Sequence, residues 1–407
     1  MIKVLKGGGV LGVAAAASFL SSVIFSKILS PSQFGELSTL FSSIAIISVF
    51  VQCGSNPFFL KEIADYKKYR LYVFGQTAIF SCFFALMYVL ALKTYHSISF
   101  GLFLVATSLL AQGVLDSQIN QRTVRTSLFQ SCSAMVKFFA ALIALFVVNI
   151  KKYDLSGNVI ISTVDVVLIY VSIVIIIYLF AFVYFNDRRY ISSFEGYLKM
   201  IRMKGFEVCK FWASSMLGIS YSLGVVPLVA FTQGYEAAAY CGLYMILWGA
   251  GNLLIIALLN NYFFPRYSLH RKNEKKARTT AKESLMGMIT ISIVSLAGLS
   301  LFGVLYSEAF WGDFYGIKSF ILLVSVALAI RPMSAWLSVI VLNFDNLVMR
   351  KIYVQIVVIS IMVLTCIFFE LKSPLEIAKY IIMLEILYFF GYFFVSYKKA
   401  KIIIFGE

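Results

Sequence analysis

Charged residues are scarce in this chain. They make up 13% of its 407 residues, against roughly 25% in an average soluble domain. Hydrophobic residues make up 61% of the chain, and its mean hydropathy is +0.89. A soluble core has no room for so much apolar surface, so the composition excludes a soluble globular fold and indicates a polytopic membrane protein.

The residues that build metal centres and soluble active sites are also few. The chain has two histidines, His96 and His270, and its six cysteines lie singly in separate apolar stretches, without a CxxC pair. It has no glycine-rich phosphate loop ending in Lys-Ser/Thr and no nucleophile elbow. We therefore expect no enzymatic activity, no metal and no cofactor. Without an ATP site, any energy that its activity requires would have to come from an ion gradient or from a substrate gradient.

Long apolar runs fill nearly all of the chain. A helix needs about 20 apolar residues to cross the hydrocarbon core of a bilayer. The first run follows Lys3 and Lys6 and continues to about Ile28, which is too long for a signal peptide. The sequence therefore predicts an all-α polytopic membrane protein with twelve transmembrane helices, at 8–28, 36–56, 71–92, 98–119, 127–150, 159–185, 206–231, 237–262, 284–306, 317–342, 352–370 and 374–396.

Basic residues gather in alternate loops between these spans. Of the 35 lysines and arginines, 25 fall on the side of the two termini, 6 on the other side and 4 inside spans. By the positive-inside rule, both termini are cytoplasmic. Most of the net charge of +16 then lies at the cytoplasmic rim, where it suits anionic lipid head groups rather than nucleic acid.

The chain also has two similar halves. Pro57 and Pro265 each end the second span of a half, and each is followed by a basic segment. The sequence predicts two lobes of six helices with a substrate site between them. The predicted divisions are an N-terminal lobe at 1–186, a cytoplasmic amphipathic linker at 187–205, a C-terminal lobe at 206–396 and a cytoplasmic tail at 397–407.

Four basic residues lie inside predicted spans: Lys137, Lys210, Arg331 and Lys379. Each costs about 2.5–3.5 kcal/mol at bilayer depth, roughly 10 kcal/mol together, which favours a role in holding an anion. Lys137 has Gln130 on its helical face and suits a polar cavity. Lys210 and Lys379 lie near span ends, where a lysine can instead extend to the interface.

Arg331 has the most polar surroundings of the four. Pro332 follows it and is expected to bend the helix, while Ser334 and Ser338 continue one face toward the cytoplasm. A bent helix beside a buried cation is typical of transporter sites. The alternative is that Arg331 pairs with a buried carboxylate and locks two helices together.

Three acids are also predicted to be buried: Asp116, Asp165 and Glu385. Intramembrane acids often bind coupling ions, and we predict that role for Asp116 and Glu385. Neutralising a neighbouring base is the alternative, and the sequence leaves both open. Asp116 belongs to a polar stripe at four-residue steps, predicted to line a cavity: Ser108, Gln112, Asp116 and Asn120.

The segment SKILSPSQFGELSTLFSSIAIISVFVQCGSNPFFLKEIADYKK carries a family resemblance. Its "LSPSQFGELS" turn, Gly54 late in the second span and the "FFLKEIA" exit with Lys61 resemble the Wzx-type O-antigen flippases. These belong to the multidrug/oligosaccharidyl-lipid/polysaccharide (MOP) exporter superfamily. The chain length and the twelve-span plan extend the resemblance to the whole chain.

The resemblance implies an alternating-access carrier for an undecaprenyl-diphosphate-linked oligosaccharide, moving it from the cytoplasmic to the periplasmic leaflet of a bacterial inner membrane. Arg331, Lys137 and Lys210 would contact the diphosphate, with Lys61 a further basic contact, and Asp116 or Glu385 would couple transport to protons. A polysaccharide polymerase and a chain-length regulator would be partners.

Two alternatives compete with this reading. A cation-coupled drug exporter of the same superfamily predicts a cavity rich in acids and aromatics. A membrane polymerase or glycosyltransferase requires a large outer loop bearing acids, and the longest predicted outer loops have about a dozen residues.

Overall fold

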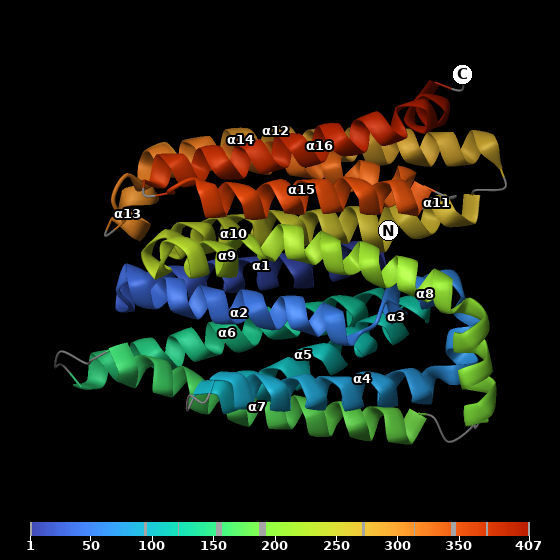
Figure 1. Cartoon of the computed structure of the whole chain (residues 1–407), viewed down its shortest axis with the longest axis horizontal. Helices are drawn as coiled ribbons and strands as arrows, with labels where there is room; N and C mark the ends of the chain where they lie inside the picture. The colour runs from blue at the N-terminus through green and yellow to red at the C-terminus, as the bar shows by residue number, and fades with distance from the viewer. Residues whose placement is uncertain are drawn as a thin grey trace. The chain divides into compact units, whose positions relative to one another are not determined.

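A computed structural model describes residues 2–92, 96–120, 122–151, 157–186, 193–270, 273–312, 314–342, 347–371 and 373–405. Every regular element in these ranges is helical (Figure 1). The chain divides into two compact units, each with its own internal packing. Unit 1 contains Met1–Val10 and Leu40–Gly224, and unit 2 contains Leu11–Thr39 and Val225–Glu407.

Unit 1 is built around α5. This helix packs against α4, α6 and α7, and it is the most buried of the membrane-length helices in the unit. Central packing explains why its polar stripe faces protein rather than lipid. The helices of unit 1 are the start of α1 (Ile2–Ile28), the second part of α2 (Pro31–Val51), α3 (Ser55–Lys61), α4 (Ile63–Leu92), α5 (His96–Ile119), α6 (Thr123–Lys151), α7 (Gly157–Asn186) and α8 (Phe194–Leu223).

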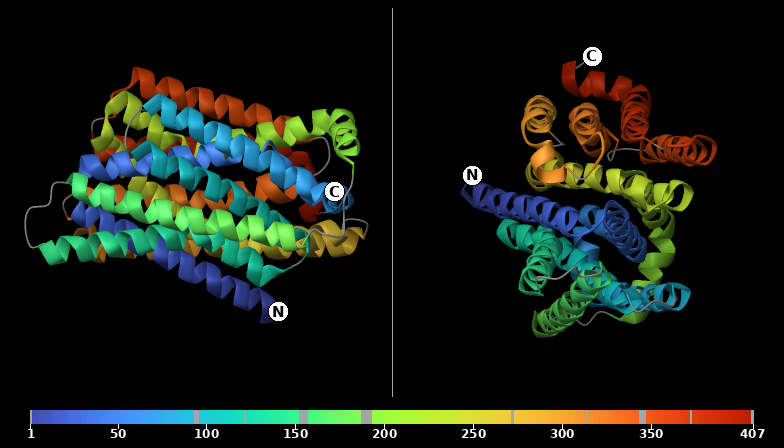
Figure 2. Two further views of the ribbon diagram at one scale, coloured as in Figure 1. Left: turned by 90° about the horizontal axis from the view of Figure 1, so that it is seen from below. Right: turned by 90° about the vertical axis from the view of Figure 1, so that its left-hand side faces the viewer.

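Unit 2 has α14 as its central helix, packed between α12 and α16. Two π-helical segments, η1 and η2, directly follow α10 and α14. The long helices of this unit run side by side (Figure 2). Its elements are most of α1 (Ile2–Ile28), the start of α2, α9 (Val225–Gln233), α10 (Tyr235–Ile255), η1 (Ile256–Phe263), α11 (Phe264–His270), α12 (Glu274–Leu305), α13 (Ser307–Trp311), α14 (Ile317–Trp336), η2 (Leu337–Val341), α15 (Val348–Phe368) and α16 (Pro374–Phe405).

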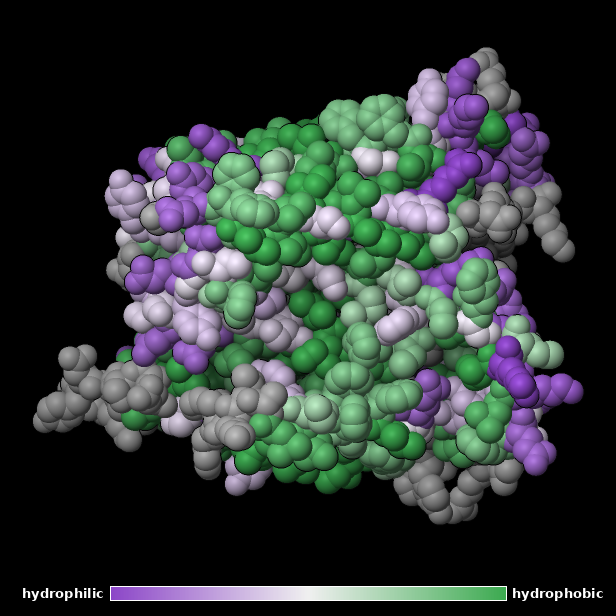
Figure 3. All heavy atoms as spheres, viewed as in Figure 1, coloured by the Kyte–Doolittle hydropathy of each residue, from purple (hydrophilic) through white to green (hydrophobic). Residues whose placement is uncertain are grey.

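The described helices have the lengths and hydropathies of membrane spans. Ten are long and apolar enough to cross a bilayer, and α8 with α9, bent by 52°, makes an eleventh. The predicted span 237–262 falls on α10 and η1, which follow one another without a break. Figure 3 shows hydrophobic residues along the lengths of α15 and α16 and hydrophilic residues toward helix ends. The predicted all-α polytopic membrane fold is confirmed.

A sharp break separates α2 from α3. The second span was predicted to reach residue 56, but α2 ends at Val51, because Cys53 and Gly54 adopt φ angles of 48° and 71°. A Cβ atom on Gly54 would lie 2.5 Å from the backbone nitrogen of Trp212 in α8. The Trp212 indole Nε1 donates a hydrogen bond to the Phe50 carbonyl oxygen, 3.2 Å away. The break therefore fixes the end of α2 against α8.

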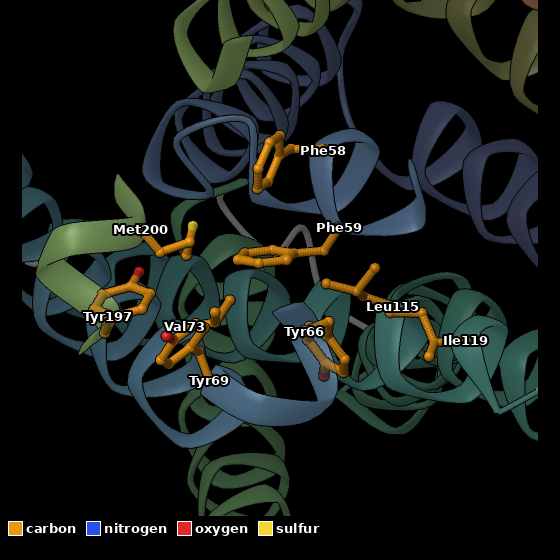
Figure 4. Close-up of a cluster of buried hydrophobic side chains, with 9 residues drawn as sticks. All are labelled: Phe58, Phe59, Tyr66, Tyr69, Val73, Leu115, Ile119, Tyr197 and Met200. Atoms are coloured by element: carbon orange, nitrogen blue, oxygen red, sulfur yellow. The ribbon is translucent and has the colours of Figure 1, made fainter. Parts of the chain in front are cut away.

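An aromatic cluster holds the start of α8 in unit 1 (Figure 4). Tyr197 and Met200 of α8 are buried, and the figure shows them beside side chains of α3 and α4. Ser193 caps this helix by accepting a hydrogen bond from the Gly196 backbone nitrogen at 3.2 Å. The segment 194–205 is thus helical and continuous with the following span. The cluster comprises Phe58, Phe59, Tyr66, Tyr69, Val73, Leu115, Ile119, Tyr197 and Met200.

Candidate functional site

Unit 1 contains a cavity of about 250 Å³ between residues of α2, α5 and α6. Its polar lining residues are Ser48, Thr107, Gln130, Ser133 and Lys137, and its other lining residues are apolar. None of the described lining residues is acidic. The cavity is therefore a partly polar space among membrane-length helices, and Lys137 is the one ionisable side chain among its described lining residues.

Lys137 lies at the middle of α6, half-buried. Its Nζ atom lies 4.2 Å from the ring centroid of Phe41 in α2. Within the part of the chain that the structure describes, no carboxylate pairs with this ammonium group. An aromatic face contributes about 0.5–2 kcal/mol to holding a cation and does not neutralise it. The Lys137 charge is thus available to a ligand in the cavity, and Gln130 lines the same cavity.

The polar stripe of α5 has a different environment. The Asp116 Oδ1 atom lies 3.0 Å from Arg70 Nε in α4 and accepts a hydrogen bond from Asn120 at 3.2 Å. Gln112 donates to the Thr77 hydroxyl at 3.0 Å. The sequence allowed two roles for Asp116, binding a coupling ion or neutralising a neighbouring base. In the structure Asp116 forms an ion pair with Arg70. None of these α5 residues lines the unit 1 cavity.

In unit 2 the structure brings Arg331 and Glu385 together, although 54 residues separate them. The Arg331 guanidinium nitrogen lies 3.0 Å and 3.2 Å from the two carboxylate oxygens. Their side chains are 11% and 2% exposed. Tyr244 of α10 donates a further hydrogen bond to Glu385 at 2.8 Å. Two candidate residues with different predicted roles therefore form one buried ion pair.

Aromatic and polar side chains enclose this pair. The Arg331 guanidinium carbon lies 5.4 Å from the Trp248 ring centroid and 5.5 Å from that of Tyr388. Tyr388 accepts hydrogen bonds from Tyr392 and from Gln355 of α15, at 3.2 Å. The network thus joins α10, α14, α15 and α16 around one charge pair.

The two serines that follow Arg331 differ in their contacts. Ser334 is fully buried, and its hydroxyl has no hydrogen-bond partner among the described residues. Ser338 lies in η2 and hydrogen-bonds Tyr392. Pro332 was expected to bend the helix; it lies inside α14, which continues to Trp336 and then becomes π-helical. The irregularity beside Arg331 is therefore a wider helical turn, which accommodates a local mismatch in the hydrogen-bond ladder.

The remaining candidates lie apart from both groups. Lys210 of α8 has its Nζ atom 4.2 Å from the ring centroid of the exposed Phe206. Lys379 of α16 is exposed. The Lys61 side chain lies outside the described residues. Neither Lys210 nor Lys379 lines the unit 1 cavity or contacts Glu385.

Some residues that contact these sites were not predicted from the sequence. Tyr244 and Trp248 reach the Arg331 pair from α10, and only their four-residue spacing in an apolar span hinted at a shared face. Arg70 was assigned to a cytoplasmic loop but pairs with a buried acid. Arg125 was likewise counted at the loop before α6, and it lies on aromatic rings of α6 and α7.

Comparisons with known proteins bear on the fold. No family model matches the chain, and no curated protein does. Among solved structures, a multidrug resistance MATE family transporter of the MOP superfamily in an inward-facing conformation matches at TM-score 0.57 and 14% identity. The match covers 95% of this chain and 96% of that chain. The chain has the fold of the MATE transporters of the MOP superfamily.

Two further structures extend the likeness. An outward-facing MATE family transporter of the MOP superfamily matches at TM-score 0.57 and 10% identity, over 98% of this chain and 95% of that chain. A MOP superfamily transporter from Pyrococcus furiosus matches at TM-score 0.54 and 12% identity, over 98% of this chain and 96% of that chain. That transporter is described as having a binding pocket of reversed polarity, suggesting a different function.

Proposed function

We propose that this protein is a flippase. It moves a diphosphate-linked lipid oligosaccharide, of the undecaprenyl O-antigen type, from the cytoplasmic to the periplasmic leaflet of a bacterial inner membrane by alternating access. The MATE-like fold supports transport, and the charge of the unit 1 cavity supports an anionic head group. The O-antigen assignment rests on the resemblance of residues 26–68 to Wzx-type flippases.

The observation that carries this proposal is Lys137 in an acid-free cavity. A cation at bilayer depth costs about 2.5–3.5 kcal/mol unless something compensates for it. Lys137 contacts the Phe41 ring and faces cavity space, and no carboxylate of the described residues pairs with it. A phosphate would supply the missing negative charge, whereas a cationic drug would be repelled. The cavity therefore favours the flippase over the drug exporter.

The Arg331–Glu385 pair supplies the coupling step in this proposal. Breaking a buried ion pair by removing one partner costs about 3–5 kcal/mol. Arg331 can therefore bind a substrate phosphate only when Glu385 is neutralised at the same time. Uptake of a proton by Glu385 neutralises it, and the phosphate then replaces the carboxylate beside Arg331. Substrate binding and proton binding would thus be linked at one residue pair.

The function is tested by deleting the gene in its bacterium and analysing the lipids. We expect diphosphate-linked oligosaccharide to accumulate in the cytoplasmic leaflet and surface polysaccharide to be lost. The wild-type gene should restore both, and the Lys379→Gln variant should restore them equally well, since Lys379 is exposed and outside the cavity. The Arg331→Ala variant should restore neither. Normal surface polysaccharide in the deletion strain would overturn the proposal.

A further inference from the structure

A single stripe on α6 connects the cavity to the first turn of the helix. Arg125, Phe129, Ser133 and Lys137 follow one another at four-residue steps, each turned about 40° around the helix from the one before, so they form a ridge that winds along α6 and places Arg125 about 120° around the helix from Lys137. The last three line the unit 1 cavity. The twelve residues from Arg125 to Lys137 span about 18 Å of helix. Lys137 lines the cavity, whereas Arg125 is not among its described lining residues and lies in the first turn of α6, N-terminal to the cavity-lining part of the ridge.

Arg125 is held against the cavity wall by aromatic rings. Its guanidinium carbon lies 3.9 Å from the ring centroid of Phe182 in α7 and 5.4 Å from that of Phe129. Phe129 packs closely on α5, where a Cβ atom on Gly113 would lie 3.2 Å from its ring. The rings thus fix both the position and the orientation of the Arg125 guanidinium.

A neighbouring arginine shows what distinguishes Arg125. Arg70 also lies over the Phe182 ring, at 5.6 Å, but its charge is paired with Asp116 at 3.0 Å. Arg125 is half-buried, and no carboxylate of the residues that the structure describes pairs with it. Stacking leaves the hydrogen-bonding edge of a guanidinium open to a phosphate. Arg125 is therefore placed and charged to receive an anion.

We propose that Arg125 is a second substrate-binding residue, at which the diphosphate head group first binds before it passes along α6 to Lys137. The proposal rests on the proposed flippase function and adds the entry step. A diphosphate is much shorter than the 18 Å or so between the two residues, so they bind it in turn. By the predicted topology, Arg125 lies at the cytoplasmic end of α6, the side from which substrate enters.

The two positions should have different kinetic signatures. A charge at the rim of a site mainly sets the association rate and its salt dependence, whereas a charge at the final binding position mainly sets the dissociation rate. Arg125→Gln should therefore slow association about three- to tenfold and weaken its dependence on salt. Lys137→Gln should instead speed dissociation. Arg125→Lys should recover part of the association rate, because it restores the charge without the stacked guanidinium.

The test is stopped-flow binding of farnesyl diphosphate to the purified full chain in detergent. The matched control is Arg122→Gln, which removes the same charge from an exposed residue three positions earlier. Thermal stability of each variant shows whether it remains folded. If Arg125→Gln associates no more slowly than Arg122→Gln while Lys137→Gln still weakens binding, the entry role is overturned and the proposed function stands. If the wild type does not bind the probe, both proposals fall.

Discussion

The two basic residues that lie deepest in the spans, Lys137 and Arg331, differ in what surrounds their charges. Arg331 faces the Glu385 carboxylate at 3.0 Å, whereas Lys137 faces the Phe41 ring and a polar cavity. The first charge contributes to holding α14 and α16 together. The second is open to a ligand. At the residue scale, the structure thus separates a paired cation from an available one.

The Arg331–Glu385 pair gives a prediction about stability. Arg331→Gln and Glu385→Gln should each lower the free energy of unfolding by about 3–5 kcal/mol, because each leaves one buried charge without its partner. The double variant should lose less than the sum of the two, since it leaves no charge behind. Unfolding of the purified variants in detergent measures all three. If the double variant loses as much free energy of unfolding as the two single variants together, the pair does not act as a unit.

Residue roles were only partly predictable from the sequence. Lys137 and Gln130 lie seven residues apart on one helix, so helical periodicity was enough to bring them together. Arg331 and Glu385 belong to helices whose register against each other is set by packing. No spacing in the sequence shows that they meet. The same holds for Arg70 and Asp116, which lie on α4 and α5.

At the scale of elements, hydrophobic runs predicted where helices occur but not how they bend. The π-helical segments η1 and η2 and the bend of 52° between α8 and α9 leave no trace in hydropathy. Pro332, which was expected to bend the helix, lies inside α14 and does not end it. The break after α2 instead depends on two residues of positive φ and a close contact with α8. Local backbone conformation and neighbour contacts decide such details.

The break after α2 gives a second prediction. Gly54→Ala should destabilise the protein by about 1–3 kcal/mol, because the residue has positive φ and its new Cβ would meet the Trp212 backbone at 2.5 Å. Thermal unfolding in detergent checks this. Gly75→Ala is the control, since Gly75 lies in α4 with no atom within 4 Å of an added Cβ. Equal stability of the two variants would contradict the role assigned to Gly54.

At the scale of the whole molecule, an apolar helical chain keeps a polar, cationic cavity within its spans. The fold is that of MATE transporters, in which the chemistry of the cavity, not the fold, must select the substrate. Composition and span count were enough to predict this architecture, because apolar length is the dominant constraint on a membrane chain. The cavity itself arises from side chains of three helices and could not be read from any one of them.

The central claim is that Lys137 binds the anionic head group during transport. The most direct measurement is the flipping rate of undecaprenyl-diphosphate-linked oligosaccharide in proteoliposomes containing wild type, Lys137→Gln, Lys137→Arg or Lys379→Gln. We predict that Lys137→Gln slows flipping about tenfold or more, because a hydrogen bond to a charged group contributes about 1.5–3 kcal/mol. Lys137→Arg should retain much of the rate, and Lys379→Gln all of it. Wild-type flipping by Lys137→Gln would contradict the account.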